Sequence, residues 1–261
     1  MAKKQTPVIV SFSGGKDSTA LLHHLLDTNQ PIAGVMRFVG GWDYEELDFH
    51  CQQVEQKTAL DIIEVYPLLD FNTYFNKIAV VANTDHPKEA IKKGDQRHLG
   101  YGWPSKRRQW CTDLKTRALD AAAKRLWPGA PQAIGFTADE TTRLLGPRQI
   151  YLRERGKVTY PLIDAGITQQ TALDQSLSHG YSWDGLYNHF RRISCWCCPL
   201  RSLTDWRILR TEYPHYWARL RAMQDACPAH HDTINHGSTV EDLERRFAAE
   251  QNGTPTKAKH A

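Results

Sequence analysis

The stretch Val8-Ile-Val-Ser-Phe-Ser-Gly-Gly-Lys-Asp-Ser18 lies near the start of a chain of 261 residues. It opens with a short β-branched run that ends at two adjacent glycines. From Ser18 to Leu26 the apolar residues recur at helical spacing. The stretch therefore predicts a strand, a glycine turn and a helix, in that order.

The residues that follow continue the alternation of strand and helix. We expect strands over 32–38, 62–65 and 133–136, helices over 44–60 and 112–126, and an extended segment over 158–163. Alternation of this kind is typical of an α/β fold with a doubly wound, mainly parallel sheet. After Pro67, glycines and prolines mark a loop-rich insertion, which we expect to cross the rim of the sheet and contact the substrate.

The glycine turn has the residues of an anion site. Gly14 and Gly15 allow backbone N–H groups to approach an anion closely, and the following helix adds the partial positive charge of its N-terminus. Lys16 supplies a full charge, Ser13 and Ser18 supply hydroxyls, and Asp17 can cap the helix or reach Mg²⁺ through water. Because the two glycines are adjacent, the loop is neither a Walker A motif nor a G-x-G-x-x-G motif.

The composition limits the remaining classes of protein. The chain lacks the run of about 20 apolar residues that a membrane span needs, and it shows no signal peptide, so we expect a cytoplasmic protein without a membrane partner. Its formal net charge is only +4, but the cations are bunched in two segments, 106–117 and 191–210. This bunching indicates an anionic partner, and the alternative is a solvated basic surface.

The loop Ser13 to Ser18 resembles the PP-loop of the adenine nucleotide α-hydrolase superfamily, whose members split ATP between the α and β phosphates or bind adenylyl sulfate nucleotides. Further stretches, 102–115, 135–143, 160–164 and 195–199, resemble the phosphoadenylyl sulfate (PAPS) reductase family. The resemblance covers roughly residues 7 to 220. True reductases of that family end in Glu-Cys-Gly-Leu-His, whereas no cysteine follows Cys227 here. The chain is therefore closest in character to the ATP pyrophosphatases of DNA phosphorothioation.

The resemblance and the loop chemistry together assign the site residues. The nucleotide is expected to contact Ser11, Ser13, Gly14, Gly15, Lys16, Asp17, Ser18, Asp139, Glu140 and Arg143. The segment that holds Asp139 to Arg143 follows a predicted strand, where open α/β sheets bind ligands, although Asp139 as a simple helix cap is an alternative. Lys16, Asp17 and Cys111 are expected to be catalytic.

The cysteines resemble an iron-sulfur pattern. Three of the six lie within four residues, which favours metal or redox chemistry over disulfides. The pattern resembles that of adenylyl sulfate reductases and implies a [4Fe-4S] cluster or zinc on Cys111, Cys195 and Cys198, with Cys197 or Cys227 as the fourth ligand. Two alternatives stay open: buried packing cysteines, or a nucleophilic thiol at Cys111 or Cys197 whose pKa nearby cations lower.

These expectations define the domains and the function. We expect a PP-loop nucleotide-binding domain over 1–180, a Cys/Trp-rich helical C-terminal subdomain over 181–250 and a flexible tail over 251–261. The expected activity is an ATP pyrophosphatase that uses Mg²⁺ and ATP to activate an acceptor for sulfur incorporation, most of all in DNA phosphorothioation. The expected partners are a cysteine desulfurase as sulfur donor and DNA or another nucleic acid bound by the basic segments. The alternatives are a PAPS or adenylyl sulfate reductase and a non-catalytic ATP-binding scaffold subunit.

Overall fold

The strand expected at the start of the chain forms the middle of a parallel sheet. The computed structural model describes residues 5–81, 97–193, 195–228, 231–235 and 237–251. Its larger sheet has the order β3-β2-β1-β6-β7, and each neighbouring pair is parallel. The strands are β1 (Val8–Ser11), β2 (Ile32–Phe38), β3 (Ile62–Val65), β6 (Gln132–Ile134) and β7 (Val158–Thr159).

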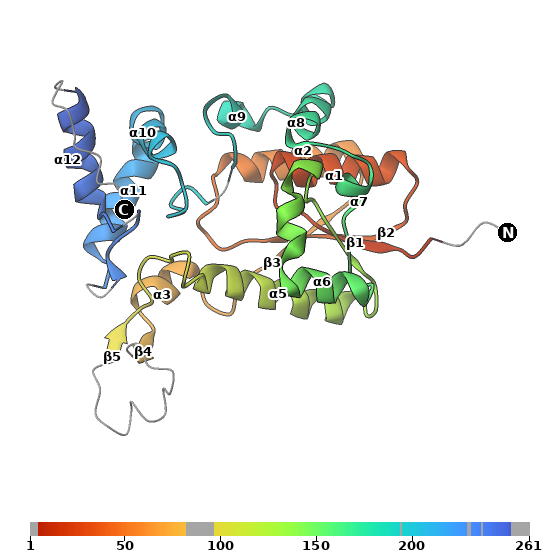
Figure 1. The fold of residues 1–261 in the computed structure, drawn as a ribbon, viewed down its shortest axis with the longest axis horizontal. Helices are drawn as coiled ribbons and strands as arrows, with labels where there is room; N and C mark the ends of the chain where they lie inside the picture. The colour runs from red at the N-terminus through yellow and green to blue at the C-terminus, as the bar shows by residue number, and fades with distance from the viewer. Residues whose placement is uncertain (1–4, 82–96, 194, 229–230, 236, 252–261) are drawn as a thin grey trace. The chain divides into compact units, whose positions relative to one another are not determined.

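Helices cover both faces of this sheet (Figure 1). One face carries α1 (Lys16–Asp27), α2 (Glu46–Thr58) and α8 (Gln169–Ser178), and the other carries α5 (Trp110–Leu126) and α6 (Pro147–Glu154). The expected α/β, doubly wound parallel fold is therefore confirmed. In the described parts of the chain, no helix is long and apolar enough to cross a bilayer.

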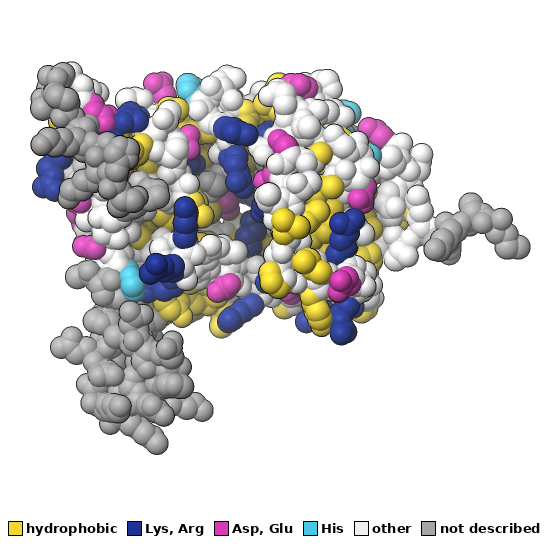
Figure 2. Space-filling model, viewed as in Figure 1, with side chains coloured by type: hydrophobic (Ala, Val, Ile, Leu, Met, Phe, Trp, Pro, Cys, Tyr) yellow, Lys and Arg dark blue, Asp and Glu magenta, His cyan; other side chains and the backbone are white. Residues whose placement is uncertain are grey.

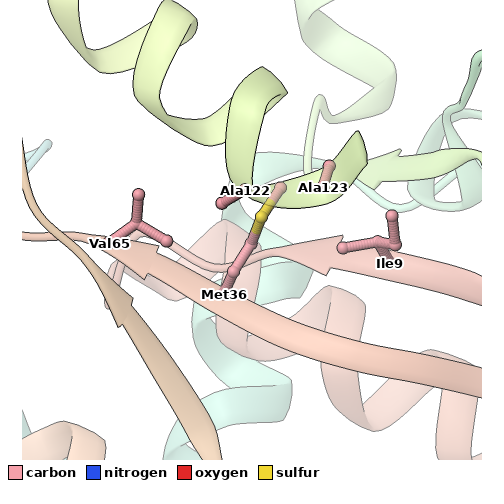
Figure 3. Close-up of a cluster of buried hydrophobic side chains, with 5 residues drawn as sticks. All are labelled: Ile9, Met36, Val65, Ala122 and Ala123. Atoms are coloured by element: carbon pink, nitrogen blue, oxygen red, sulfur yellow. The ribbon is translucent and has the colours of Figure 1, made fainter. Parts of the chain in front are cut away.

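Small side chains let α5 approach the sheet closely. Figure 3 shows Ala122 and Ala123 of α5 over Ile9, Met36 and Val65, which come from three neighbouring strands. All five are buried and form one hydrophobic cluster. Burial of apolar surface at about 25 cal/mol per Å² makes such a cluster a main source of stability.

A glycine in β2 has a packing role in the same layer. A Cβ atom on Gly34 would lie 1.9 Å from the ring of Trp127, which packs against this hydrophobic cluster. No side chain fits in that space. Gly34 therefore allows the indole to lie directly on the backbone of the strand.

Shorter elements complete the connections of the sheet: η1 (Ala138–Leu145), α7 (Pro161–Asp164), η2 (Trp183–Gly185) and α9 (Leu186–His189). The extended segment expected over 158–163 is only partly correct, because the strand ends at Thr159 and α7 begins at Pro161. Proline fixes φ near the helical value and suits the first position of a helix, which explains the early end of the strand.

The chain forms two units, one of residues 1–67 and 114–194 and one of 68–113 and 195–261. The first holds the parallel sheet. The division differs from the expected domain limits, because 181–194 belong to the sheet unit and the insertion 68–113 belongs with the C-terminal part. The expected tail over 251–261 lies, beyond its first residue, outside the described residues.

The second unit joins the insertion to the C-terminal helices. Its elements are α3 (Phe71–Asn76), the antiparallel strands β4 (Ala79–Val81) and β5 (Arg97–Leu99), and the helices α10 (Leu203–Glu212), α11 (Pro214–Asp225) and α12 (Val240–Gln251). Trp103 of the insertion is buried and donates its Nε1 hydrogen to Gln224 of α11 over 3.1 Å. Such a buried bond between distant segments ties the insertion to the C-terminal helices.

Candidate functional site at the sheet switch point

The order of the sheet reverses between β1 and β6. From β1 the chain proceeds to β2 and β3 on one side, whereas β6 and β7 lie on the other side of β1. In open parallel sheets, ligands bind at the carboxyl ends of the strands at such a reversal. The two segments that leave these strands are the glycine loop after β1 and the segment 135–143 after β6.

These two segments are in direct contact. A Cβ atom on Gly135 would lie 3.0 Å from the carbonyl oxygen of Asp17 and 3.2 Å from the amide nitrogen of Ser18. Because both of these are backbone atoms, they have little freedom to move aside. Gly135 therefore lets the end of β6 lie against the first turn of α1.

The glycine loop is held in shape by its own hydroxyls. Ser18 Oγ donates to the carbonyl oxygen of Gly15 over 2.9 Å and accepts from the backbone N–H of Ser13 over 3.2 Å. Gly14 has φ of +79°, a left-handed value that favours glycine. The loop thus turns sharply into α1, whose first helical residue is Lys16.

Lys16 and Asp17 form an ion pair at the start of α1. Lys16 is buried, with 4% exposure, and its Nζ lies 2.7 Å from Asp17 Oδ1. Burial raises the pKa of Asp17, the Lys16 charge opposes this, and the nearby Glu140 carboxylate adds to the rise. No side chain caps the start of α1 by a hydrogen bond, so Asp17 is not its cap. The carboxylates of Asp17 and Glu140 lie near each other at the switch point.

The segment after β6 is fixed by a capping box. Thr137 is the N-cap of η1, and Glu140 is its reciprocal partner, so the expected alternative of Asp139 as the cap is wrong. Asp139 Oδ1 instead accepts the backbone N–H of Gln169 at the start of α8, over 3.1 Å. Glu140 also pairs with Arg143 over 2.9 Å.

A segment that the sequence analysis assigned to another domain packs on the loop. The indole Nε1 of Trp183 donates to the carbonyl oxygen of Gly14 over 2.7 Å, and the backbone N–H of Lys16 donates to Tyr187 Oη over 2.7 Å. The two aromatic rings meet edge to face with centroids 4.7 Å apart. Burial raises the pKa of Tyr187, so its phenol stays neutral. Neither residue was predicted to belong to this site.

A pocket opens beside the start of α1. It has a volume of about 280 Å³ and is lined by Lys16, Asp139, Gln169, Gln170, Leu173, Tyr187, Phe190 and Arg191. Cationic and amide side chains dominate its polar wall. Of the expected nucleotide contacts, Lys16 and Asp139 line this pocket, and Ser13, Gly14, Gly15, Asp17 and Ser18 form the adjoining loop.

Ser11 occupies a different position from the loop hydroxyls. It is the last residue of β1, and its Oγ donates to Gln132 Oε1 of the neighbouring β6 over 3.1 Å. Its side chain therefore joins two strands, and its expected contact with the nucleotide stays a prediction.

A buried histidine lies behind the loop. His50 of α2 is fully buried, its Nε2 lies 2.9 Å from Thr19 Oγ1 of α1, and its ring stacks on Trp183 with centroids 4.5 Å apart. Burial lowers the pKa of His50 to about 3, and the charge of Arg37 adds to the effect. The ring is therefore neutral and serves as packing material between the two helices and Trp183.

The cysteines expected to bind a metal gather in the second unit. Cys197 is fully buried and lies close to Cys195 and Cys198, while Cys111 at the start of α5 lies close to Cys198. Within the described ranges, however, no three cysteine, histidine or acidic side chains are placed to hold a metal ion. The cluster or zinc ion expected on these cysteines therefore stays a prediction.

The expectation that nearby cations lower the thiol pKa of Cys111 or Cys197 is wrong, whereas a role of either thiol in the reaction stays a prediction. Burial raises the pKa of both thiols, and the neighbouring Cys198 adds to the rise in each case. The cations expected to lower the pKa of Cys111 do not overcome burial. Cys51, in contrast, is a buried residue of α2.

Three side chains of the two basic segments form hydrogen bonds within the protein. Arg108 donates to the carbonyl oxygen of Tyr101, Arg201 is buried and donates to that of Cys195 over 3.4 Å, and Arg207 forms two hydrogen bonds with Glu250. Lys106, Arg107, Arg191 and Arg192 have exposed side chains. Figure 2 shows further Lys and Arg side chains among hydrophobic ones over η1 and α6, where Leu145, Ile150 and Tyr151 are exposed.

Comparison with known proteins yields little. No protein-family model matches the chain, and no curated protein matches it. Among solved structures, it is similar to the U34-tRNA thiolase NcsA from Methanococcus maripaludis with its [4Fe-4S] cluster, at 14% sequence identity and a TM-score of 0.42. The match covers 99% of this chain and 77% of the thiolase. At this TM-score the likeness carries no argument about the site or its chemistry.

Proposed function

We propose that the chain is an ATP pyrophosphatase, which transfers the AMP part of ATP to an acceptor and releases pyrophosphate. The observation that carries this proposal is the glycine loop itself, placed at the switch point of a parallel sheet with Lys16 and the N-terminus of α1 beside a polar pocket. Backbone N–H groups, a helix N-terminus and a lysine are the donors that polyphosphates require.

The proposed step is an in-line displacement at the α-phosphorus of ATP. An acceptor oxygen forms a bond to that phosphorus, and the bond from the phosphorus to the oxygen that bridges to the β-phosphorus breaks. The electron pair leaves with pyrophosphate. A sulfur nucleophile then attacks the activated atom of the acceptor, and AMP leaves with the acceptor oxygen.

Charge stabilisation supplies most of the rate enhancement in such a step, because no covalent intermediate with the protein is needed. Lys16 neutralises charge that develops on the leaving group. The N–H groups at the start of α1 orient the phosphate oxygens, and the hydrogen bonds within the loop keep these donors in place before the substrate arrives.

The acidic side chains suit a magnesium ion. Mg²⁺ is usually held by one or two carboxylates together with substrate phosphates and water. Burial raises the pKa of Asp17, and the charge of the nearby Glu140 adds to the rise, so the two carboxylates lie on the same side of the site. They are the carboxylates that would hold the ion. When bound there, Mg²⁺ would neutralise phosphate charge.

The reaction products test this proposal. Purified protein is incubated with Mg²⁺ and ATP, with and without candidate acceptors, and the nucleotides are separated. AMP with pyrophosphate is expected. ADP with phosphate would instead indicate a different bond cleavage.

We further propose that the acceptor is DNA and that the modification is phosphorothioation, with a cysteine desulfurase as sulfur donor. In that case a carrier persulfide attacks the adenylated phosphate, and a thiol supplies the two electrons that release the sulfur from its carrier. Contacts to DNA phosphates are supported by four exposed cations, Lys106, Arg107, Arg191 and Arg192. Arg108 and Arg201 instead donate hydrogen bonds to backbone carbonyl oxygens, so we do not propose them as phosphate contacts.

A DNA titration at several salt concentrations tests the acceptor. Each neutralised duplex phosphate contributes a slope of about −0.9 in log affinity against log salt. Arg107→Glu is expected to reduce both the affinity and the slope. The matched reversal Arg148→Glu replaces an arginine that pairs with Asp120 on α5 and should have less effect. Absence of binding at low salt, or equal effects of the two variants, would contradict DNA as the acceptor.

A further inference from the structure

The hydroxyl of Tyr187 lies on the glycine loop. It accepts the backbone N–H of Lys16 over 2.7 Å, and a Cβ atom on Gly15 would lie 3.2 Å from it. This N–H belongs to the first turn of α1, whose N–H groups lack an acceptor within the helix and ordinarily face water, a cap or an anion. The phenol therefore stands between the helix N-terminus and the pocket that it lines.

The hydrogen of this hydroxyl is available to a ligand. Tyr187 Oη uses a lone pair to accept from Lys16, and among the described residues no acceptor takes up its own hydrogen. A hydroxyl that accepts a hydrogen bond becomes a better donor, because chains of hydrogen bonds polarise one another. Tyr187 can thus donate a strengthened hydrogen bond to an oxygen in the pocket, and in this way it extends the effect of the positive N-terminus of α1.

Arg191 lies four residues further along the chain and lines the same pocket. The pocket wall therefore combines the ammonium group of Lys16, the guanidinium group of Arg191, the phenol of Tyr187 and the amides of Gln169 and Gln170. Asp139 is the single carboxylate of the wall, and its Oδ1 already accepts the Gln169 N–H. The apolar side chains of Leu173 and Phe190 complete the wall of this pocket of about 280 Å³. Its polar part, with two cations and three neutral donors, offers the groups that phosphate oxygens bind.

We propose that this pocket binds the pyrophosphate part of the nucleotide, with Tyr187 and Arg191 as residues that position it. The proposal rests on the proposed function for the identity of the nucleotide, but the subsite itself is defined by its donors. A phosphate oxygen accepts the Tyr187 hydroxyl, and Arg191 neutralises the charge at the far end. Neither residue is part of the glycine loop, so the subsite extends the loop rather than repeating it.

The test is calorimetric titration of the full chain with magnesium pyrophosphate. Tyr187→Phe keeps the ring and its edge contact with Trp183 but removes the hydroxyl. Loss of one hydrogen bond to a charged group predicts about a tenfold rise in Kd. Arg191→Gln, at an exposed position that should not affect folding, is expected to raise Kd by about tenfold or more. The matched controls are Tyr151→Phe and Arg148→Gln on α6, which should leave Kd unchanged.

A second readout separates positioning from a general effect on the loop. AMP lacks the β and γ phosphates, so its binding should be unchanged in both variants, while that of pyrophosphate weakens. If Tyr187→Phe binds pyrophosphate more tightly, the hydroxyl competes with the ligand and the proposal is wrong. Unchanged binding in both variants, or no binding to the wild type, also overturns it.

The outcomes distinguish this proposal from the proposed function. Weakened pyrophosphate binding in the variants, together with ADP and phosphate as products from ATP, would leave the subsite standing and refute the pyrophosphatase. Release of AMP and pyrophosphate, together with unchanged pyrophosphate binding in the variants, would refute the subsite alone.

Discussion

The indole Nε1 of Trp183 donates a hydrogen bond to the carbonyl oxygen of Gly14 over 2.7 Å, across a separation of 169 residues. Both groups are buried. The glycine loop is therefore braced by a distant segment of the same unit as well as by its own hydroxyls. Trp183 itself has φ of +49°, a costly value for a bulky residue, which indicates that its position is enforced by the contacts around it.

Trp183→Phe tests this brace. The substitution leaves the Gly14 carbonyl oxygen buried without its donor, which costs about 1–3 kcal/mol. Urea denaturation should show this loss, and the KM for ATP should rise because the loop is less well held. The matched control is Trp206→Phe, since Trp206 is fully buried in the other unit and its Nε1 has no partner among the described residues. Trp206→Phe should lower stability without changing KM, and equal KM values for the two variants would contradict the brace.

Gly135→Ala tests the contact between β6 and α1. The added Cβ atom would lie 3.0 Å from Asp17 O, so the first turn of α1 must shift. Since a misplacement of 1 Å can cost about 10²-fold in rate, we expect kcat/KM for ATP to fall by about tenfold or more. Gly146→Ala is the control, because its nearest neighbour would be 3.8 Å away and its φ is −65°. Wild-type kcat/KM for Gly135→Ala would show that the contact does not position the site.

Lys16→Ala and Asp17→Ala test the roles of the loop side chains. Each removes a group that the proposed mechanism places against the phosphates or the metal, and neither residue belongs to the hydrophobic cluster under α5. We expect ATP cleavage to be lost, by about 10²-fold or more, while the far-UV circular dichroism and the unfolding midpoint stay close to wild type. Cleavage at the wild-type rate by either variant would remove that residue from the mechanism.

The buried imidazole of His50 predicts acid sensitivity. Its pKa is about 3 in the folded chain and about 6.5 when unfolded. Between these values the unfolded state binds a proton that the folded state does not, so stability rises with pH. The contribution is complete above about pH 6.5 and is lost as the pH falls toward 3.

Thermal unfolding from pH 7 to pH 4 measures this linkage. The Tm of the wild type should fall over the interval, and His50→Gln, which keeps a polar partner for Thr19, should flatten the slope. Burial also lowers the pKa of His23, to about 4. The Tm of His50→Gln should therefore still fall somewhat as the pH falls. An identical slope in wild type and His50→Gln would contradict the assignment to His50.

The elements with strong local signals could be predicted from the sequence. Strands β2 (Ile32–Phe38) and β3 (Ile62–Val65) have the predicted bounds because they are short apolar runs between turn residues. The glycine loop was also predictable, since Gly14 and Gly15 stand between a strand and a helix. Such signals depend only on neighbouring residues.

The remainder of the site depends on contacts between distant residues. Tyr187 meets Lys16 across 171 positions, and no periodicity near Tyr187 indicates that contact. Trp183 was assigned to the C-terminal subdomain because other tryptophans follow it, but it packs on α2 and the loop instead. The pKa of Cys111 was misjudged for a similar reason, because the sequence shows the nearby cations but not the burial that outweighs them.

The most direct test of the proposed activity is the fate of the γ-phosphate label of ATP. The full chain is incubated with Mg²⁺ and γ-labelled ATP, with Lys16→Ala as the control, and the labelled products are separated. The label is expected to appear in pyrophosphate, in amounts equal to the AMP formed, and Lys16→Ala is expected to release little or none. Label in inorganic phosphate with ADP as the nucleotide product, or equal release by wild type and Lys16→Ala, would contradict the proposed activity.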